Sequence, residues 1–191
     1  MRVPYRPLKR LADALVAAGL LLLLAPLLLL LALLVRSDSP GPVLFRQQRI
    51  GRGGQPFAIL KFRSMVVDAS QRGGYQTSAG DPRITRVGRW LRRSSLDELP
   101  QLLNVLRGDM SLVGPRPDVP AQQSLYSPRD WQLRCSVRPG ITGLAQATLR
   151  SAATASQRLE LDLRYVRRQS LVLDLQVLAQ TAGQVLLRGG F

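Results

Sequence analysis

The sequence predicts a mainly helical α+β protein that is anchored in a membrane by its N-terminal helix. Three observations support this fold class. Residues 11–35 form an almost uninterrupted apolar run, residues 43–60 have the pattern of a small β-hairpin, and residues 152–187 have the spacing of two amphipathic helices. The length of 191 residues suits one domain with an added membrane element.

The apolar run is long enough to cross a membrane. A helix over Ala14–Val35 would be roughly 33 Å long, whereas the hydrocarbon core of a bilayer is about 30 Å thick. A cleaved signal peptide is disfavoured because the run is too long and no small-residue cleavage pattern follows it. Pro26 lies near the middle, and basic residues flank both ends. The residues alone leave two alternatives open, a kinked membrane span and a re-entrant helix broken at Ala25-Pro26.

Two short apolar runs, Val43-Leu44-Phe45 and Phe57-Ala58-Ile59-Leu60, flank a glycine-rich segment at residues 49–54. This pattern predicts a β-hairpin. Lys61 and Arg63 follow the second strand, and we expect them to share one face because alternate residues of a strand point to the same side. Residues 66–86 are polar and rich in Gly and Ser, which favours a surface loop.

The C-terminal part predicts amphipathic helices over Ala152–Arg168 and Leu171–Leu187. A shorter helix is expected around Arg129–Cys135, whereas Val137–Gln146 is too rich in Gly and Pro for a regular element. The apolar stripes of the two long helices pack in the core or lie on a basic membrane interface, and we favour the core. The stripe residues are Leu159, Leu163, Val166, Leu171, Leu175, Leu178 and Val185.

The composition favours anionic partners and excludes several chemistries. The chain has 27 Lys and Arg against 12 Asp and Glu, a formal charge of +15, and only two lysines, Lys9 and Lys61. Arginine binds phosphate through a planar fork of donors. The sequence contains no His, which excludes imidazole acid–base catalysis and His metal ligands, and Cys135 is the single cysteine, which excludes intrachain disulfides.

An adjacent acid pair, Asp97 and Glu98, stands out among the few residues that could act as catalysts. One interpretation is structural: Ser95 caps a helix and Glu98 completes a capping box. Capping explains one carboxylate more readily than two beside Arg92 and Arg93. Because neighbours on a helix diverge by about 100°, one acid can reach a ligand while the other orients it. The residues leave both interpretations open.

A stiff turn, Gly114-Pro115-Arg116-Pro117, presents a guanidinium with little conformational entropy to lose. This suits bidentate phosphate binding, although a solvated Arg on a rigid loop is an equal alternative. Arg138-Pro139-Gly140 repeats the arrangement. A site of carboxylate and phosphate oxygens would suit Mg²⁺. The sequence has no Walker glycine loop and no dinucleotide fingerprint.

Residues 95–117, Ser-Leu-Asp-Glu-Leu-Pro-Gln-Leu-Leu-Asn-Val-Leu-Arg-Gly-Asp-Met-Ser-Leu-Val-Gly-Pro-Arg-Pro, resemble the signature of the bacterial sugar transferases. These are monotopic phosphoglycosyl transferases. The runs Lys61–Met65, Val137–Gln146 and Leu161-Asp162 with Tyr165-Val166 also match. The resemblance covers essentially the whole chain.

The resemblance implies transfer of a sugar-1-phosphate from a UDP-sugar to polyprenol (undecaprenyl) phosphate, with release of UMP, at the start of glycoconjugate or polysaccharide assembly. It implies a ping-pong mechanism in which Asp97 forms a covalent phosphosugar intermediate and Glu98 assists. It also implies Mg²⁺ as cofactor, with Asp97 as a ligand. Lys61, Arg92 and Arg116 occupy the positions of the family's phosphate-binding residues.

The resemblance further implies donor binding by Arg138, Gln146, Arg150 and Asp162. One departure concerns Gln146-Ala147-Thr148-Leu149-Arg150-Ser151, where the family often has Gln-Val-Asn-Gly-Arg-Asn. Arg150 keeps its register, but the Asn-Gly pair is absent, which puts donor recognition there in question.

The family's architecture implies a re-entrant anchor over residues 1–36 and a catalytic domain over 37–191. The protein is then a monotopic protein of the bacterial cytoplasmic (inner) membrane, with interfacial amphipathic helices, membrane-lipid contacts and the catalytic domain on the cytoplasmic face. The chain would be a minimal catalytic form. The rival hypothesis is a non-enzymatic, basic, membrane-bound scaffold for anionic lipid or nucleic acid. Aromatic residues make up only 5% of the chain, so base stacking and a nucleic-acid partner are poorly supported. The sequence does not predict an oligomeric state.

Overall fold

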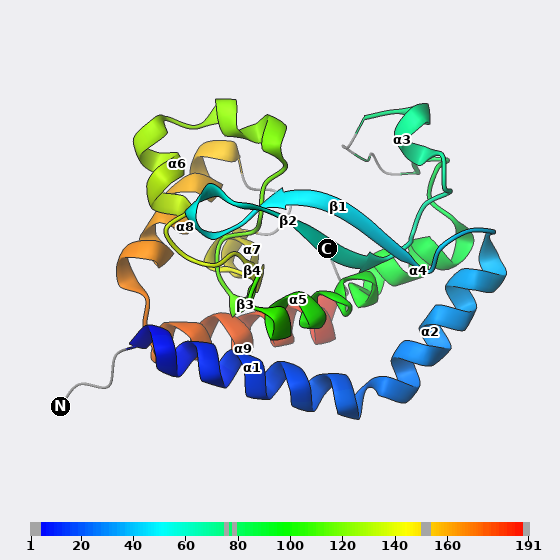
Figure 1. The fold of residues 1–191 in the computed structure, drawn as a ribbon, viewed down its shortest axis with the longest axis horizontal. Helices are drawn as coiled ribbons and strands as arrows, with labels where there is room; N and C mark the ends of the chain where they lie inside the picture. The colour runs from blue at the N-terminus through cyan, green and yellow to red at the C-terminus, as the bar shows by residue number, and fades with distance from the viewer. Residues whose placement is uncertain (1–4, 75–76, 78–79, 150–153, 189–191) are drawn as a thin grey trace.

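The computed structural model describes residues 5–74, 77, 80–149 and 154–188, and it confirms a mainly helical α+β protein (Figure 1). Two small sheets are formed, one by β1 and β2 and one by β3 and β4. The helices are α1 (Tyr5–Leu23), α2 (Ala25–Asp38), α3 (Ala69–Arg72), α4 (Arg86–Ser94), α5 (Gln101–Arg107), α6 (Pro128–Arg134), α7 (Leu144–Leu149), α8 (Ala155–Arg168) and α9 (Leu171–Arg188). The strands are β1 (Leu44–Ile50), β2 (Pro56–Phe62), β3 (Ser111–Val113) and β4 (Gly140–Thr142), and short 3₁₀ turns are η1 (Arg52–Gly54), η2 (Leu96–Glu98) and η3 (Pro120–Leu125).

The apolar N-terminal run forms two helices, α1 and α2, with a bend of 65° between them. In the described chain no single helix is both long and apolar enough to cross a membrane, but this bent pair together meets both criteria. The break lies at Leu24, one residue before the predicted Ala25-Pro26. Pro26 therefore falls in the first turn of α2, where a backbone N–H has no intrahelical partner to lose.

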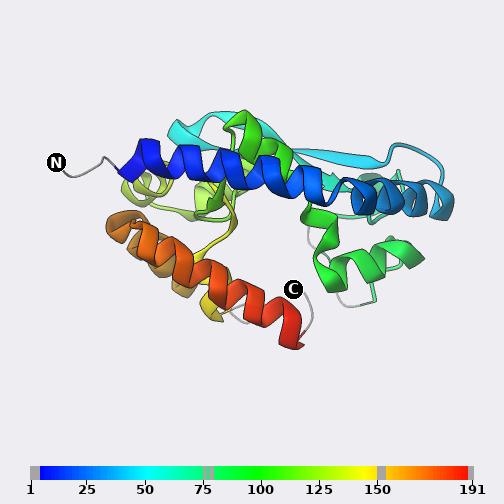
Figure 2. The same ribbon diagram turned by 90° about the horizontal axis from the view of Figure 1, so that it is seen from below.

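Both helices of this bent pair share their cores with the rest of the chain. Ala17 of α1 is buried with Ile59 and Val105, and Leu31 of α2 is buried with Leu91. Figures 1 and 2 show α1 beside α5 and α2 leading up to the end of the hairpin and α4. α2 ends at Asp38, and the residues before and after the predicted boundary at residue 36 share two hydrophobic clusters, so the division into an anchor and a catalytic domain stays a prediction. Other large apolar side chains of the pair are exposed: Leu11, Leu15, Leu22, Leu23, Leu29 and Leu33.

The predicted hairpin is confirmed as an antiparallel pair, with Leu44 opposite Phe62 and Ile50 opposite Pro56. Its turn requires glycine, because Gly53 and Gly54 have φ angles of 70° and 77°. The pairing places Lys61 at the end of the hairpin next to α4 and leaves the turn at the opposite end. Lys61 and the hairpin turn therefore lie at opposite ends of the hairpin.

The expectation that Val137–Gln146 lacks regular structure is wrong. This run contains β4, which pairs in parallel with β3, and the start of α7. Its glycines serve close backbone approach: a Cβ added at Gly140 would lie 2.1 Å from the backbone nitrogen of Gly114. A strand of three residues has too few apolar side chains to leave a recognisable pattern.

The two C-terminal helices form where predicted, but the core-facing side of α9 differs from the prediction. Leu171 and Leu175 are exposed, whereas Asp174 and Val177 are buried. Asp174 is buried because the hydroxyls of Tyr5 and Tyr165 donate to its carboxylate at 2.8 and 2.7 Å. With these polar partners from distant elements, α9 is oriented so that Asp174, rather than the predicted leucine stripe, faces the core. The side chain of Val185 lies outside the described residues.

Candidate active site

The acid pair lies in the 3₁₀ turn η2, immediately after α4 ends. Ser95 lies between α4 and this turn and has a left-handed backbone (φ 56°). Its N–H donates to the carbonyls of Leu91 and Arg92 in the last turn of α4. The predicted capping box is therefore wrong: the Ser95 side chain caps neither η2 nor a helix over the pair. Glu98 is instead drawn away by cations from other parts of the chain.

Glu98 is held between two cations. Lys61 Nζ donates to its Oε1 at 2.6 Å, and Arg116 Nη2 donates to the same oxygen at 2.7 Å. Burial acts to raise the pKa of Glu98, but the charges of Arg116 and Lys61 outweigh it and hold the pKa below its usual range. The pKa of Lys61 is lowered by burial, which its attraction to Glu98 opposes. Glu98 is thus a permanent anion that fixes two basic side chains.

Asp97 is in the opposite state. It is buried, yet no described side chain forms a hydrogen bond or ion pair with its carboxylate. Burial raises its pKa to about 6, although the nearby charges of Lys61 and Arg92 act to lower it. A buried carboxylate without a fixed partner, kept only partly stabilised in its ionised form, is typical of a functional group.

Asp97 and Lys61 line a pocket of about 780 Å³ that the hairpin and the loop before α4 enclose. This volume is in the range of small-molecule binding sites. Among the described residues that line it, Asp97 is the only acid. The basic side chains that line it are Arg46, Arg49, Lys61, Arg63, Arg83 and Arg92. Arg92 also donates to the Thr77 hydroxyl at 2.7 Å. The pocket therefore offers one carboxylate in a strongly basic environment, which suits an anionic substrate.

A buried ion-pair network supports the turn that carries Arg116. Arg134 donates to the Arg116 carbonyl and pairs with Asp118 and Asp162, and all three charged side chains are buried. Arg49 Nη1 donates to the Pro117 carbonyl at 3.1 Å. Asp162, a predicted donor-binding residue, does not line the pocket and lies in this network instead.

Arg134 and Asp118 were missed by sequence reasoning. The signal for Arg134 was its position on α6, three residues after the buried Trp131, which places a charge on the buried face of an amphipathic helix. No comparable signal marks Asp118, because its burial depends on η3 and α8 closing over it.

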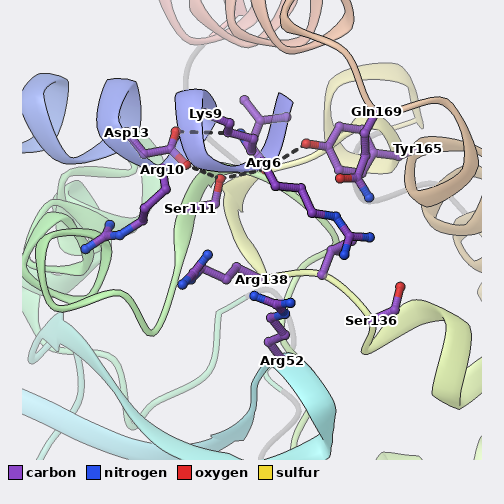
Figure 3. A pocket seen from close by; sticks show the side chains of 12 residues that line it. Arg6, Lys9, Arg10, Asp13, Arg52, Ser111, Ser136, Arg138, Tyr165 and Gln169 are labelled. Atoms are coloured by element: carbon purple, nitrogen blue, oxygen red, sulfur yellow. Dashed lines mark hydrogen bonds and ion pairs between the residues drawn. The ribbon is translucent and has the colours of Figure 1, made fainter. Parts of the chain in front are cut away.

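The structure brings Asp97, Glu98, Lys61, Arg92 and Arg116 together and places Asp162, Arg138 and Gln146 elsewhere. Arg138 lines a different pocket, under α1 (Figure 3). Gln146 donates to the Ile141 carbonyl at 3.3 Å and approaches Gly143 beside Gly114. Arg150 lies outside the described residues. Donor binding by these side chains stays a prediction.

A magnesium site made by protein carboxylates alone is not present among the described residues, since no cluster of three or more potential ligands forms there. Glu98 is committed to its cations, so Asp97 is the one carboxylate that the pocket offers. Mg²⁺ commonly binds through one or two carboxylates together with substrate phosphates and water. The residues present therefore fit an ion that arrives with a phosphate substrate.

Comparison with known proteins agrees with this site. The family model for bacterial sugar transferases matches residues 4–188. The chain belongs to the bacterial sugar transferase family. The match contains every residue of the site described above.

Three relatives cover most of the chain. It is 49% identical to a UDP-glucose:undecaprenyl-phosphate glucose-1-phosphate transferase of Caulobacter vibrioides, over 93% of this chain and 69% of that protein. It is 45% identical to a protein of the same name from Escherichia coli, over 92% of this chain but only 39% of that protein. It is 46% identical to the exopolysaccharide production protein PSS of Rhizobium leguminosarum bv. phaseoli, over 95% of this chain and 96% of that protein.

Proposed function

We propose that this protein is a phosphoglycosyl transferase that moves a sugar-1-phosphate from a UDP-sugar to polyprenol (undecaprenyl) phosphate and releases UMP. The observation that carries the proposal is the unpaired Asp97 carboxylate beside the Lys61–Glu98–Arg116 cluster, at the wall of a basic pocket. The names of the relatives, which specify UDP-glucose and undecaprenyl phosphate, support the substrate class. The product would initiate glycoconjugate or polysaccharide assembly.

The reaction proceeds in two displacements. In the first, an Asp97 oxygen forms a bond to the phosphorus that carries the sugar, and the bond from this phosphorus to the bridging oxygen breaks, so that UMP leaves with that oxygen. In the second, a phosphate oxygen of the polyprenol phosphate attacks the same phosphorus and expels the Asp97 carboxylate. A covalent intermediate lets one pocket serve a soluble donor and then a lipid acceptor in turn.

Attack by an anion on an anionic diphosphate requires neutralising charge. Lys61 and Arg92 line the pocket together with Asp97, and Arg116 forms an ion pair with the adjacent Glu98. Mg²⁺, held by Asp97 and the donor phosphates, would add neutralising charge when bound. Because Asp97 has a pKa of about 6, roughly nine-tenths of it is ionised at pH 7 and ready to attack.

Glu98 acts mainly as a positioning residue in this mechanism. Its lowered pKa and its two ion pairs make it a poor proton acceptor. It holds Lys61 at the pocket and orients Arg116 instead. In this proposal, Glu98 therefore assists Asp97 through these two cations.

The membrane placement belongs to the same proposal. A helix pair bent by 65°, with exposed leucines on both helices, supports a re-entrant anchor that returns both ends to the cytoplasmic face. Cysteines introduced at residues 4 and 38 in a Cys135→Ala background should both be protected from an impermeant periplasmic thiol reagent. Labelling at either position would indicate a full span.

The activity test is UMP release from a panel of UDP-sugars with Mg²⁺ and undecaprenyl phosphate. Asp97→Asn should abolish both turnover and the phosphosugar adduct seen by intact mass. Glu160→Gln, which removes an exposed carboxylate, is the matched control and should keep both. A folded wild-type protein that releases no UMP from any donor would leave the scaffold hypothesis in its place.

A further inference from the structure

A second basic pocket lies at the opposite end of the hairpin from Asp97. It is formed by the start of α1, the turn of the hairpin and the segment before β4 (Figure 3). Its basic lining residues are Arg6, Lys9, Arg10, Arg52 and Arg138. It shares no lining residue with the pocket of Asp97. A seven-residue strand is about 20 Å long, so the two pockets are separate sites.

The single acid among the described lining residues does not neutralise this cluster. Asp13 accepts a hydrogen bond from the Ser111 hydroxyl at 2.7 Å and lies 3.6 Å from Lys9 Nζ. Lys9 makes its closer ion pair with Asp174, at 2.9 Å. These contacts account for Lys9 and Asp13 and leave four arginines without a carboxylate partner.

Two of the arginines are held in place by backbone carbonyls. Arg10 donates to the Val105 and Leu106 carbonyls at 2.6 and 2.9 Å, and Arg138 Nε donates to the Gly108 carbonyl at 2.8 Å. These acceptors lie at the C-terminal end of α5, where the helix dipole supplies only a partial negative charge. The two side chains are therefore positioned but keep most of their positive charge.

The side chains of the other two, Arg6 and Arg52, form no hydrogen bond or ion pair with any described residue. Figure 3 shows Arg6 extending down from α1 and Arg52 rising from the hairpin turn towards Arg138. The pKa of Arg138 is lowered, first by burial and then by the like charges of Arg10 and Arg52. Asp13 opposes this lowering only in part, so the described part of the protein holds these like charges together with no carboxylate paired to them.

We propose that this pocket binds a phosphate group, presented either by a lipid headgroup or by a soluble phosphate ester. Its volume of about 40 Å³ exceeds that of one water molecule and suits a single tetrahedral oxyanion better than a nucleotide. Guanidinium groups bind phosphate oxygens through paired N–H donors, and Arg6 and Arg52 have these donors available. The pocket also lies at the start of α1, from which the apolar run continues, so a headgroup at a membrane surface could reach it.

The test compares wild type with the double variant R6Q/R52Q and with the control R129Q/R164Q. The control removes two exposed arginines that line neither pocket. The thermal midpoint of each full-length protein is measured in uncharged detergent with inorganic phosphate, against sodium chloride of equal ionic strength. In a second arm, native mass spectrometry counts the phosphatidylglycerol retained from nanodiscs that mix it with phosphatidylcholine.

We expect phosphate to raise the midpoint of wild type and control, and R6Q/R52Q to lose most of this rise. Phosphate bound in the pocket of Asp97 contributes equally to all three proteins and cancels in the comparison. Loss of retained phosphatidylglycerol in R6Q/R52Q alone assigns the pocket to a lipid headgroup. Equal retention, together with the lost phosphate response in the first arm, assigns it to a soluble phosphate. Equal responses of R6Q/R52Q and the control in both arms would overturn the proposal. Should the double variant not fold, the single change Arg52→Gln, on the exposed hairpin turn, serves in its place.

Discussion

The two adjacent acids of the site should have opposite effects on stability. Asp97 is buried without a partner, so its negative charge destabilises the folded state at neutral pH. Asp97→Asn keeps the shape of the side chain and removes the charge. We therefore expect this inactive variant to be more stable than the wild type.

The magnitude follows from the pKa of Asp97. Burial raises it from 3.8 to about 6, and each pKa unit is worth about 1.4 kcal/mol, so the ionised carboxylate destabilises the fold by about 3 kcal/mol at pH 7. Between pH 4 and 6 the folded state retains a proton that the unfolded state has released. The stability contributed by Asp97 therefore falls as the pH rises through this window, and the advantage of Asp97→Asn shrinks to about half at pH 5.

The assay is chemical denaturation of both proteins in the same detergent at pH 7 and pH 5. Glu98→Gln is the matched comparison, because it leaves Lys61 and Arg116 without their carboxylate and should destabilise the fold by about 3–5 kcal/mol. An Asp97→Asn variant that is no more stable than wild type at pH 7, or a gain that is the same at both pH values, would refute the description of Asp97 as a destabilised anion.

Three further outcomes are expected. Because Asp97 must be ionised and its pKa is about 6, kcat/KM for UMP release should fall about tenfold per pH unit below pH 6. A pH–rate profile whose acidic decline begins only near pH 4 would contradict this. Arg134→Met leaves the buried Asp162 without its ion-pair partner and Asp118 with only Arg158 and Tyr126, and it should lower the free energy of unfolding by about 3–5 kcal/mol in denaturant titrations. Gly88→Ala would place a Cβ 2.0 Å from the Ser64 carbonyl oxygen and should lower the thermal midpoint, whereas Gly19→Ala, with open space around the added Cβ, should not.

Much of the candidate site was predictable from local sequence. Asp97, Glu98 and Arg116 stand in one continuous run, and the hairpin pattern placed Lys61 at the end of a strand. The different roles of Asp97 and Glu98 were not predictable. It depends on Lys61 and Arg116 converging on Glu98 from distant parts of the chain, while no described side chain forms a hydrogen bond or ion pair with Asp97.

The misassigned elements share one physical cause. Ser95 has the sequence context of a helix N-cap, but its left-handed backbone ends α4, and Glu98 pairs with Lys61 and Arg116 instead. On α9 the leucines have helical spacing, yet Asp174 takes the buried position because tyrosine hydroxyls meet it there. In both cases long-range polar contacts outweigh local propensity.

The amino-acid sequence by itself determined the apolar helical run with its break near Pro26, the hairpin, the long helices and the identity of the acid pair, because periodicity, Pro and Gly act over short stretches of chain. Only the tertiary structure decided which acid is clamped and which is left unpaired, that Arg134 supports the Arg116 turn, and that Arg138 joins Arg6 and Arg52 in a second pocket. These outcomes depend on charges that lie far apart in the chain and meet only after folding, where burial strengthens their interactions and sets their pKa values.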